Sequence, residues 1–289
     1  MTGQKIDGTL VANSVKDLVK ASVAELKKDG IDPCLATVLI GDDPASASYV
    51  ASKQKDCAQV GIITKDHKLP QAFSQKEIDS LINLLNNDDT VHGILVQLPL
   101  PKTLDEFATM ARISPIKDVD GLTPYNMGLL SSGRAILKPC TPSGIMLLFD
   151  YYEIDLAGKN AVIINRSNLV GKPLYHLMLE KNATVTTCHS RTGNLKQHCL
   201  EADVIVTAVG DRDRFTLTAD MIKPGSVVID VGTSRVDGKI TGDADYEDII
   251  KKASYATPVP GGVGPMTRAM LLRNTVTAAS ISKGFVTNR

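Results

Sequence analysis

Four short apolar segments in the second half of the chain constrain its fold more than any other feature. Helix-length or loop segments separate them: NAVIIN (160–165), ATVTTCHS (183–190), ADVIVTAVG (202–210) and SVVIDVG (226–232). Short β-branched runs of this kind predict buried parallel strands, and their regular spacing is typical of a doubly wound nucleotide-binding sheet. We therefore expect a Rossmann-type α/β domain over residues 140–266.

The first third of the chain predicts another α/β unit. CLATVLIG (34–41) and GILVQLP (93–99) are expected to form buried strands. Between them, Asp43-Pro44 is typical of a helix start and Gly61 of a helix end, and residues 75–86 predict a second helix. Strand–helix–strand alternation indicates a parallel sheet with helices on its faces.

Long helices are predicted near both ends of the chain. Residues 10–28 predict an amphipathic helix that stops before Gly30, and residues 267–283 predict another that is followed by Gly284. The segment TPVPGGVGPMT (257–267) is expected to be a shaped loop, because its three prolines and three glycines disfavour a regular element. The apolar stripe of the first helix comprises Leu10, Val11, Val15, Leu18, Val19, Val23 and Leu26.

The composition is that of a soluble globular protein of one large or two modest domains. The 289 residues include 32 basic and 32 acidic side chains, which argues against a nucleic-acid-binding surface. No apolar run approaches the ~20 residues that span a bilayer, and the N-terminus does not resemble a signal peptide, so we expect a cytoplasmic protein. Neither cysteines nor histidines show zinc-site spacing. We expect reduced, mostly buried thiols at Cys34, Cys57, Cys140, Cys188 and Cys199.

Tyr49 and Lys53 are four residues apart in the helix predicted after Asp43-Pro44, so both side chains project from one face. A lysine beside an aromatic ring in a partly desolvated cleft can exchange protons during catalysis. The alternative is a surface lysine with a tyrosine packed against its stem. Short-chain dehydrogenases use the same spacing, but there it follows a glycine-rich turn, whereas here it precedes the nucleotide-binding pattern.

Two further motifs carry polar groups that could bind a ligand. Gln97 lies at the carboxyl end of a predicted strand, where open α/β sheets bind ligands, although the backbone could satisfy its amide instead. KDVDG (117–121) contains Asp118 and Asp120. Such a pair could hold a divalent cation, a single carboxylate could accept two N–H donors from an amino-pyrimidine, or the motif could be a turn before Gly121.

The strand at 160–165 leads into a polar turn, a glycine and a helix whose N-terminus could face a phosphate, although GxGxxG is absent. The next strand ends without the acidic residue that NAD enzymes use for the ribose 2′-hydroxyl. Arg166, Ser167, Ser190 and Arg191 would instead suit a 2′-phosphate. The sequence therefore favours NADP over NAD.

Taken together, the motifs resemble those of the bifunctional methylenetetrahydrofolate dehydrogenase/methenyltetrahydrofolate cyclohydrolase family. The matching segments are collinear and spread over nearly the whole chain, which makes the resemblance far more specific than any single motif. They are GDDPASASYVASKQKDCAQVGI (41–62), GILVQLPLP (93–101), KDVDGLTPYNMG (117–128), PCTPSGIM (139–146), NRSNLVGKP (165–173), ATVTTCHSRT (183–192) and TPVPGGVGPMT (257–267).

The resemblance implies two α/β domains flanking a cleft, with the C-terminal helix returning to the first domain. Residues 1–139 plus 267–289 would bind folate and residues 140–266 NADP. The implied reactions are NADP-dependent oxidation of 5,10-methylenetetrahydrofolate to 5,10-methenyltetrahydrofolate and its hydrolysis to 10-formyltetrahydrofolate. They would serve one-carbon metabolism and purine biosynthesis in a metal-free, cytoplasmic homodimer that accepts tetrahydrofolates, polyglutamylated ones included. The alternatives are a monofunctional dehydrogenase and a non-catalytic binding protein.

The resemblance also implies roles for single residues. Lys53 would be the central catalytic residue, Gln97 would orient it, and Asp120 would bind the pterin ring. Tyr49 would stack on the folate, and a loop at 260–264 would close over it from the interdomain side. The implied substrate-binding residues are Tyr49, Val96, Leu98, Pro260, Gly261, Gly262, Val263 and Gly264. The implied cofactor-binding residues are Asn165, Arg166, Ser167, Ser190 and Thr233.

Asn165 departs from the family pattern, which usually has glycine at this position. Glycine there permits a positive φ and a close approach of the backbone to the cofactor. Asparagine is the next-best residue for a left-handed backbone, so we expect the turn to be kept. Its side chain could alter cofactor affinity or the choice between NADP and NAD.

Overall fold

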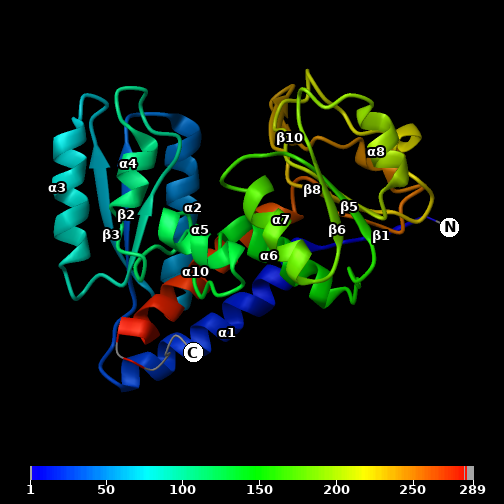
Figure 1. The fold of residues 1–289 in the computed structure, drawn as a ribbon. Helices are drawn as coiled ribbons and strands as arrows, with labels where there is room; N and C mark the ends of the chain where they lie inside the picture. Colours follow the sequence, from blue (N-terminus) through cyan, green and yellow to red (C-terminus); the bar gives the residue numbers. More distant parts are fainter. Residues whose placement is uncertain (1, 283, 285–289) are drawn as a thin grey trace. The chain divides into compact units, whose positions relative to one another are not determined.

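In the computed structural model, which describes residues 2–282 and 284, the chain divides into two units that each combine parallel strands with helices (Figure 1). Unit 1 comprises Met1–Ala12 and Thr141–Thr267, and unit 2 comprises Asn13–Cys140 and Arg268–Arg289. The first twelve residues thus group with unit 1, whereas the predicted first domain included them. The reason is that β1 (Gln4–Lys5) pairs in parallel with β11 (Tyr255–Ala256).

Unit 1 contains a six-stranded sheet in the order β1-β11-β8-β7-β5-β6, with every adjacent pair parallel. Strands β6 and β7 flank β5 on opposite sides, so the strand order reverses between β5 and β7. Open parallel sheets bind ligands at the carboxyl ends of the strands at such a point. The four strands predicted between 160 and 232 are present within shorter bounds: β5 (Asn160–Ile164), β6 (Thr184–Cys188), β7 (Val204–Thr207) and β8 (Val227–Asp230).

The remaining elements of unit 1 cover and connect this sheet. Val162 and Ile164 of β5, Ile205 of β7 and Val228 of β8 form a buried core with Cys199 of α8. A short antiparallel hairpin, β9–β10, follows β8. The bounds are α6 (Cys140–Tyr151), α7 (Gly171–Glu180), α8 (Leu195–Glu201), the 3-10 turn η1 (Ala219–Met221), β9 (Ser234–Val236), β10 (Lys239–Thr241) and α9 (Tyr246–Ile249).

Unit 2 is built on a three-stranded parallel sheet in the order β3-β2-β4, with α3 on one side and α2 on the other (Figure 1). Alternate residues of β2 pack against Ile78, Ile82 and Leu85 of α3. Because β3 and β4 flank β2, the strand order of this sheet also reverses, and the carboxyl ends of β2 and β4 are where such sheets bind ligands. The bounds are β2 (Cys34–Ile40), α2 (Pro44–Val60), β3 (Ile63–Leu69), α3 (Gln75–Asn86), β4 (Gly93–Val96), α4 (Glu106–Ala111) and α5 (Pro124–Ser131).

The two long helices differ from their predictions in detail. In α1 (Gly8–Lys28), Leu10 and Leu18 are 52% and 71% exposed, so they do not belong to the buried stripe. Helix α10 (Val263–Ser282) begins within the segment expected to be a loop. Pro265 lies in its first turn, where the backbone N–H groups have no intrahelical acceptor and a proline is tolerated. Residue 283, where the predicted helix ended, lies outside the described residues.

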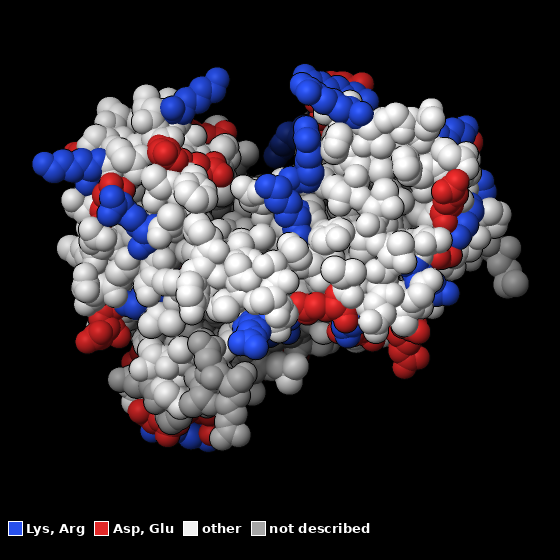
Figure 2. All heavy atoms as spheres, viewed as in Figure 1, with Lys and Arg blue, Asp and Glu red and all other residues white. Residues whose placement is uncertain are grey.

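Charged side chains of both signs share the surface. Figure 2 shows Lys and Arg interspersed with Asp and Glu over the face in view. Among residues 2–282 and 284, no helix combines the length and apolar character needed to cross a membrane. All five cysteines, which were predicted to be reduced and mostly buried, are free and buried.

Candidate active site

Lys53 and Gln97 are brought together at the carboxyl end of the unit 2 sheet. Lys53 lies on α2, which follows β2, and Gln97 is the first residue after β4. Lys53 Nζ donates a hydrogen bond to Gln97 Oε1 at 3.0 Å. Gln97 Nε2 donates to the Leu98 carbonyl at 2.7 Å, and the Gln97 N–H donates to the Val38 carbonyl at 2.9 Å. The amide is therefore held with its oxygen toward the lysine.

Local sequence explains why α2 presents Lys53 here. The Asp43 carboxylate caps the helix by accepting a hydrogen bond from the Ser46 N–H at 2.8 Å. The helix ends at Gly61, whose φ of 83° is the left-handed conformation that glycine adopts without strain. Tyr49 lies one turn before Lys53 and is 50% exposed, so its ring is available to a ligand.

Asp56, one turn after Lys53, fixes α2 to two other helices of unit 2. Its carboxylate is 4% exposed and lies 2.5 Å from the Lys16 ammonium of α1 and 3.0 Å from the Arg268 guanidinium of α10. A buried carboxylate needs such partners, because removing one of them leaves an uncompensated charge. Sequence reasoning missed Asp56, since its partners are distant in the chain.

Of the two carboxylates in KDVDG, Asp118 has a structural role. It is fully buried and accepts hydrogen bonds from Leu122 N–H at 3.2 Å, Thr123 N–H at 2.8 Å and Asn126 Nδ2 at 2.8 Å. Burial raises the pKa of Asp118, and these hydrogen bonds oppose that effect. Within the described part of the chain, no group of three or more His, Cys, Asp or Glu side chains could hold a metal ion. Asp120 is partly exposed, and its contact with a substrate stays a prediction.

The charges of Asp120 and Lys53 both influence the pKa of the Cys140 thiol. Burial is the main cause that raises the pKa of Cys140 well above its usual value. The charge of Asp120 and a hydrogen bond with it raise that pKa further, whereas the charge of Lys53 lowers it. The raised pKa keeps the Cys140 thiol protonated, which fits its hydrogen bond to the Val119 carbonyl at 3.3 Å.

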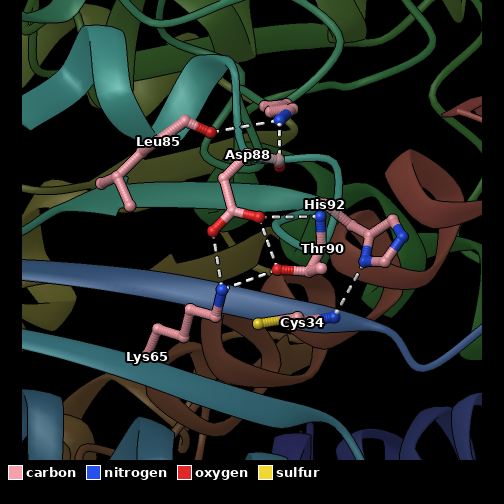
Figure 3. A network of polar contacts seen from close by, with 7 residues as sticks. Cys34, Lys65, Leu85, Asp88, Thr90 and His92 are labelled. Carbon is pink, nitrogen blue, oxygen red and sulfur yellow. Dashed lines mark hydrogen bonds and ion pairs between the residues drawn. The ribbon is translucent and has the colours of Figure 1, made fainter.

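A polar network around Asp88 lies at the amino end of the same sheet (Figure 3). The segment that carries Asp120 begins beside this network, at Lys117. Lys117 is 8% exposed, and its ammonium donates to the carbonyls of Leu85 at 3.1 Å and Asp88 at 2.8 Å. Burial lowers the pKa of Lys117. The Asp88 carboxylate in turn pairs with Lys65 of β3 at 2.7 Å. Because Leu85 lies in the last turn of α3, Lys117 joins that helix end to the start of KDVDG.

The other predicted substrate residues are dispersed. The side chain of Val96 is 2% exposed and packs in the core of unit 2, with Leu98 partly buried against it. The residues from Pro260 to Gly264 belong to unit 1, where the Gly261 carbonyl accepts from the Thr9 N–H at 3.2 Å. Contacts of these residues with a substrate stay predictions.

Asn165 directly follows β5 and has no positive φ, so the expected left-handed conformation is wrong. The turn is instead held by its side chain. Asn165 Nδ2 donates to the Ala208 carbonyl after β7 at 2.6 Å, and Oδ1 accepts from the N–H groups of Ser167 at 2.7 Å and Gly171 at 3.0 Å. A Cβ on Gly171 would lie 2.2 Å from the backbone carbonyl oxygen of Asn165, so this helix start requires glycine.

Two buried carboxylates shape the loops after β7 and β8. Asp243 accepts hydrogen bonds from Thr207 Oγ1 at 2.8 Å and from the N–H groups of Val209 and Gly210 at 2.6 and 2.9 Å. Asp230 accepts from the N–H groups of Gly232 at 2.9 Å, Asp243 at 3.0 Å and Ala244 at 2.8 Å. These loops border an open polar cavity of about 330 Å³ lined by residues 210–213 and 233–236.

The residues around this edge fit a phosphorylated dinucleotide. Arg166, Ser190 and Arg191 are exposed directly after β5 and β6, which are neighbours in the sheet. Guanidinium and hydroxyl groups are suitable donors for a phosphate. Thr233 borders the polar cavity after β8. The donor set and the cavity are thus both at the edge where open parallel sheets bind ligands.

The raised pKa of Asp230 should make the free energy of unfolding depend on pH. Burial is the first cause that raises the pKa of Asp230 from 3.8 to about 6. The folded state therefore keeps a proton that the unfolded state loses, and stability falls as the pH rises from about 4 to about 6. We compare the unfolding free energy of wild type with that of Asp230→Asn at two pH values. Relative to the variant, wild type should be about 1.4 kcal/mol more stable at about pH 5 than it is at about pH 8. Urea unfolding measures it, and a difference independent of pH would contradict the assignment.

The fold and the two sites define a two-domain α/β enzyme with a nucleotide-binding parallel sheet. The family model for the tetrahydrofolate dehydrogenase/cyclohydrolase catalytic domain matches residues 6–120, and the model for the NAD(P)-binding domain of the same family matches residues 139–283. The chain belongs to this bifunctional tetrahydrofolate dehydrogenase/cyclohydrolase family, as its motifs predicted.

Individual relatives agree over nearly the whole chain. The bifunctional protein FolD of Nitrosopumilus maritimus is 67% identical over 282 residues, which are 98% of each chain. The crystal structure of the bifunctional FolD enzyme of Campylobacter jejuni is 47% identical, covers 98% of this chain and 99% of its own, and has a TM-score of 0.94. The Trypanosoma brucei enzyme in complex with NADP and an inhibitor is 34% identical with a TM-score of 0.93, over 98% of this chain and 99% of its own.

Proposed function

We propose that this chain oxidises 5,10-methylenetetrahydrofolate with NADP and then hydrolyses the product to 10-formyltetrahydrofolate. The family membership supports both reactions, and the bifunctional relatives favour this activity over the monofunctional alternative. The observation that carries the hydrolytic half is the hydrogen bond between Lys53 Nζ and Gln97 Oε1 at 3.0 Å.

In the oxidation, NADP supplies the hydride acceptor at C4 of its nicotinamide. The hydride leaves the bridging carbon of the folate, which becomes the cationic methenyl form. The protein's contribution is alignment of donor and acceptor. Asp120 anchors the pterin through paired hydrogen bonds, Tyr49 stacks on the folate, and the residues Pro260–Gly264 contact it. Arg166, Ser167 and Ser190 bind the cofactor phosphate, Thr233 holds the cofactor at the polar cavity, and Asn165 shapes the turn.

In the hydrolysis, water attacks the methenyl carbon and one C–N bond of the ring breaks. Lys53 accepts one proton from the attacking water and returns it to the leaving nitrogen, so the amine is restored at the end. The second proton of the water is released to solvent when the formyl C=O forms, which balances the loss of the positive charge of the methenyl substrate. Gln97 accepts one N–H of the lysine, which directs the nitrogen lone pair of the neutral amine away from Gln97. No metal is required by this sequence of steps.

Supplying 5,10-methenyltetrahydrofolate directly tests the hydrolytic half alone. We expect 10-formyltetrahydrofolate to form faster than in buffer, without any dependence on NADP. A rate equal to the uncatalysed rate, in an enzyme that still reduces NADP, would leave the monofunctional dehydrogenase as the correct function.

The preference for NADP predicts the effect of removing Arg166. Arg166→Ala should raise KM for NADP about ten-fold or more, because a charge-assisted hydrogen bond to the 2′-phosphate is lost, and should change KM for NAD much less. Lys196→Ala is a matched control, because it removes another surface cation of unit 1 that pairs with Asp220. Equal effects of Arg166→Ala on both cofactors would contradict the phosphate contact.

We further propose that the enzyme is a cytoplasmic homodimer that serves purine biosynthesis and accepts polyglutamylated folates. Two features of unit 1 support the dimer. Strand β6 lies at the edge of the sheet with most of its side chains exposed, and the apolar side chains of Leu169, before α7, and Leu179, on α7, are also exposed. Such a surface could pack against a second copy. Sedimentation should give twice the mass of the 30.9 kDa chain, whereas a monomer at assay concentration would exclude the dimer.

A further inference from the structure

Asn274, on the C-terminal helix α10, makes an unusual set of contacts for a helix residue. Its side chain is buried, with 4% of the residue exposed. Nδ2 donates hydrogen bonds to the Val119 carbonyl at 2.8 Å and to the Lys138 carbonyl at 2.9 Å, and lies 3.7 Å from Cys140 Sγ. One amide group therefore joins two segments that are distant from α10 in the sequence.

These two segments carry the residues around the candidate active site. Val119 directly precedes Asp120, and Lys138 lies two residues before Cys140. The segments are in close contact, because a Cβ on Gly121 would lie 2.6 Å from the Lys138 carbonyl carbon. The Cys140 thiol donates to the same Val119 carbonyl at 3.3 Å.

A primary amide suits this position for a chemical reason. Its nitrogen has two hydrogens, so it can donate to two carbonyls at once. An aspartate of the same shape would offer only acceptors to those carbonyls, and an alanine would offer no polar group. Serine retains one donor, and it is shorter.

We propose that Asn274 is a positioning residue for the folate reactions, because it holds the Val119 and Lys138 carbonyls and so sets the place of Asp120 relative to Lys53. The proposal rests on the proposed role of Asp120 in binding the pterin. Asn274 acts through the backbone and does not itself touch the substrate. Lys117 fixes the start of this segment, and the Asp118 carboxylate fixes its end by accepting from the N–H groups of residues 122 and 123. Asn274 fixes the peptide next to Asp120.

The experiment compares Asn274→Ala, Asn274→Asp and Asn274→Ser with Thr275→Val. Thr275 is the matched control, because it is adjacent and fully buried, and its hydroxyl bonds to the Leu271 carbonyl within α10 at 2.9 Å. The measurements are kcat and KM for methenyltetrahydrofolate hydrolysis, KM for NADP in the dehydrogenase reaction, and thermal unfolding. We expect Asn274→Ala and Asn274→Asp to lower kcat/KM for the folate about a hundred-fold, with KM for NADP unchanged and Asn274→Ser intermediate.

Thr275→Val should lose thermal stability and keep the folate kinetics. The proposal is overturned if the folded Asn274 variants retain wild-type folate kinetics, or if Thr275→Val, at a similar drop in unfolding temperature, loses as much kcat/KM for the folate as they do. If Asn274→Ala does not fold, Asn274→Ser gives the same comparison. Asp120→Asn separates the two levels: loss of activity in Asp120→Asn but not in the Asn274 variants refutes this inference alone, and activity in Asp120→Asn refutes the proposed role of Asp120.

Discussion

Lys53→Met is expected to abolish the hydrolysis of methenyltetrahydrofolate. The substitution keeps the length and apolar stem of the side chain but removes the amine that exchanges protons with water and the leaving nitrogen. General acid–base catalysis by one group contributes about 10²–10⁴-fold, so the catalysed rate should fall toward the rate in buffer. Gln97 also loses its partner at 3.0 Å. The release of formyl product from methenyl substrate measures the effect.

Lys55→Met is the matched control for this change. Lys55 lies on the same helix but is exposed, and nothing places it beside Gln97. We expect both activities of Lys55→Met to equal those of wild type. A full hydrolytic rate in folded Lys53→Met would remove Lys53 from the mechanism, and the proton transfers would then belong to another group.

Gly232→Ala is expected to disrupt the cofactor edge of unit 1. The new Cβ would lie 2.1 Å from the carboxylate carbon of Asp243, which is fully buried. That carboxylate holds Thr207 at the end of β7 and Gly210 in the loop that follows, so it cannot move without losing buried hydrogen bonds. Overpacking and unpaired polar groups together should cost about 3 kcal/mol or more of unfolding free energy. We also expect KM for NADP to rise about a hundred-fold, because the loops around Thr233 are displaced.

The control for Gly232→Ala is Gly193→Ala, also in unit 1. A Cβ on Gly193 would have no heavy atom within 4 Å, and its φ is not positive, so the substitution should leave stability and cofactor binding unchanged. Methenyltetrahydrofolate hydrolysis should survive in folded Gly232→Ala, since Lys53, Gln97 and Asp120 belong to unit 2. A normal KM for NADP in Gly232→Ala would contradict the importance of this loop.

Strands buried on both faces were the easiest part of the fold to predict. Segments such as 202–210 and 226–232 are continuous β-branched runs, and both contain strands in the structure. Strand β3 was missed because its sequence, ITKDHKL, lies at a sheet edge and mixes polar with apolar residues. The early start of α10 was missed because glycine and proline usually indicate loops, although both are tolerated in a first helical turn.

Some residues of the candidate site could likewise be selected from local sequence, and others could not. Lys53 and Gln97 could be selected from local sequence, since one lies on a capped helix and the other at a strand end. The residue pattern of KDVDG could not separate Asp118 from Asp120, and only the family resemblance selected Asp120. The folded loop shows that Asp118 accepts hydrogen bonds from three donors. Asp56 and Asn274 carried no local signal, as their partners lie far away in the chain. Such residues become visible only when tertiary contacts are known.

One measurement tests the central claim most directly. Purified protein is supplied with 5,10-methylenetetrahydrofolate and NADP, and NADPH, methenyltetrahydrofolate and 10-formyltetrahydrofolate are followed in the same reaction. We expect NADPH together with 10-formyltetrahydrofolate, formed faster than uncatalysed hydrolysis allows. NADPH with accumulating methenyltetrahydrofolate would contradict the hydrolytic role of Lys53, and no NADPH would contradict the NADP-dependent oxidation itself.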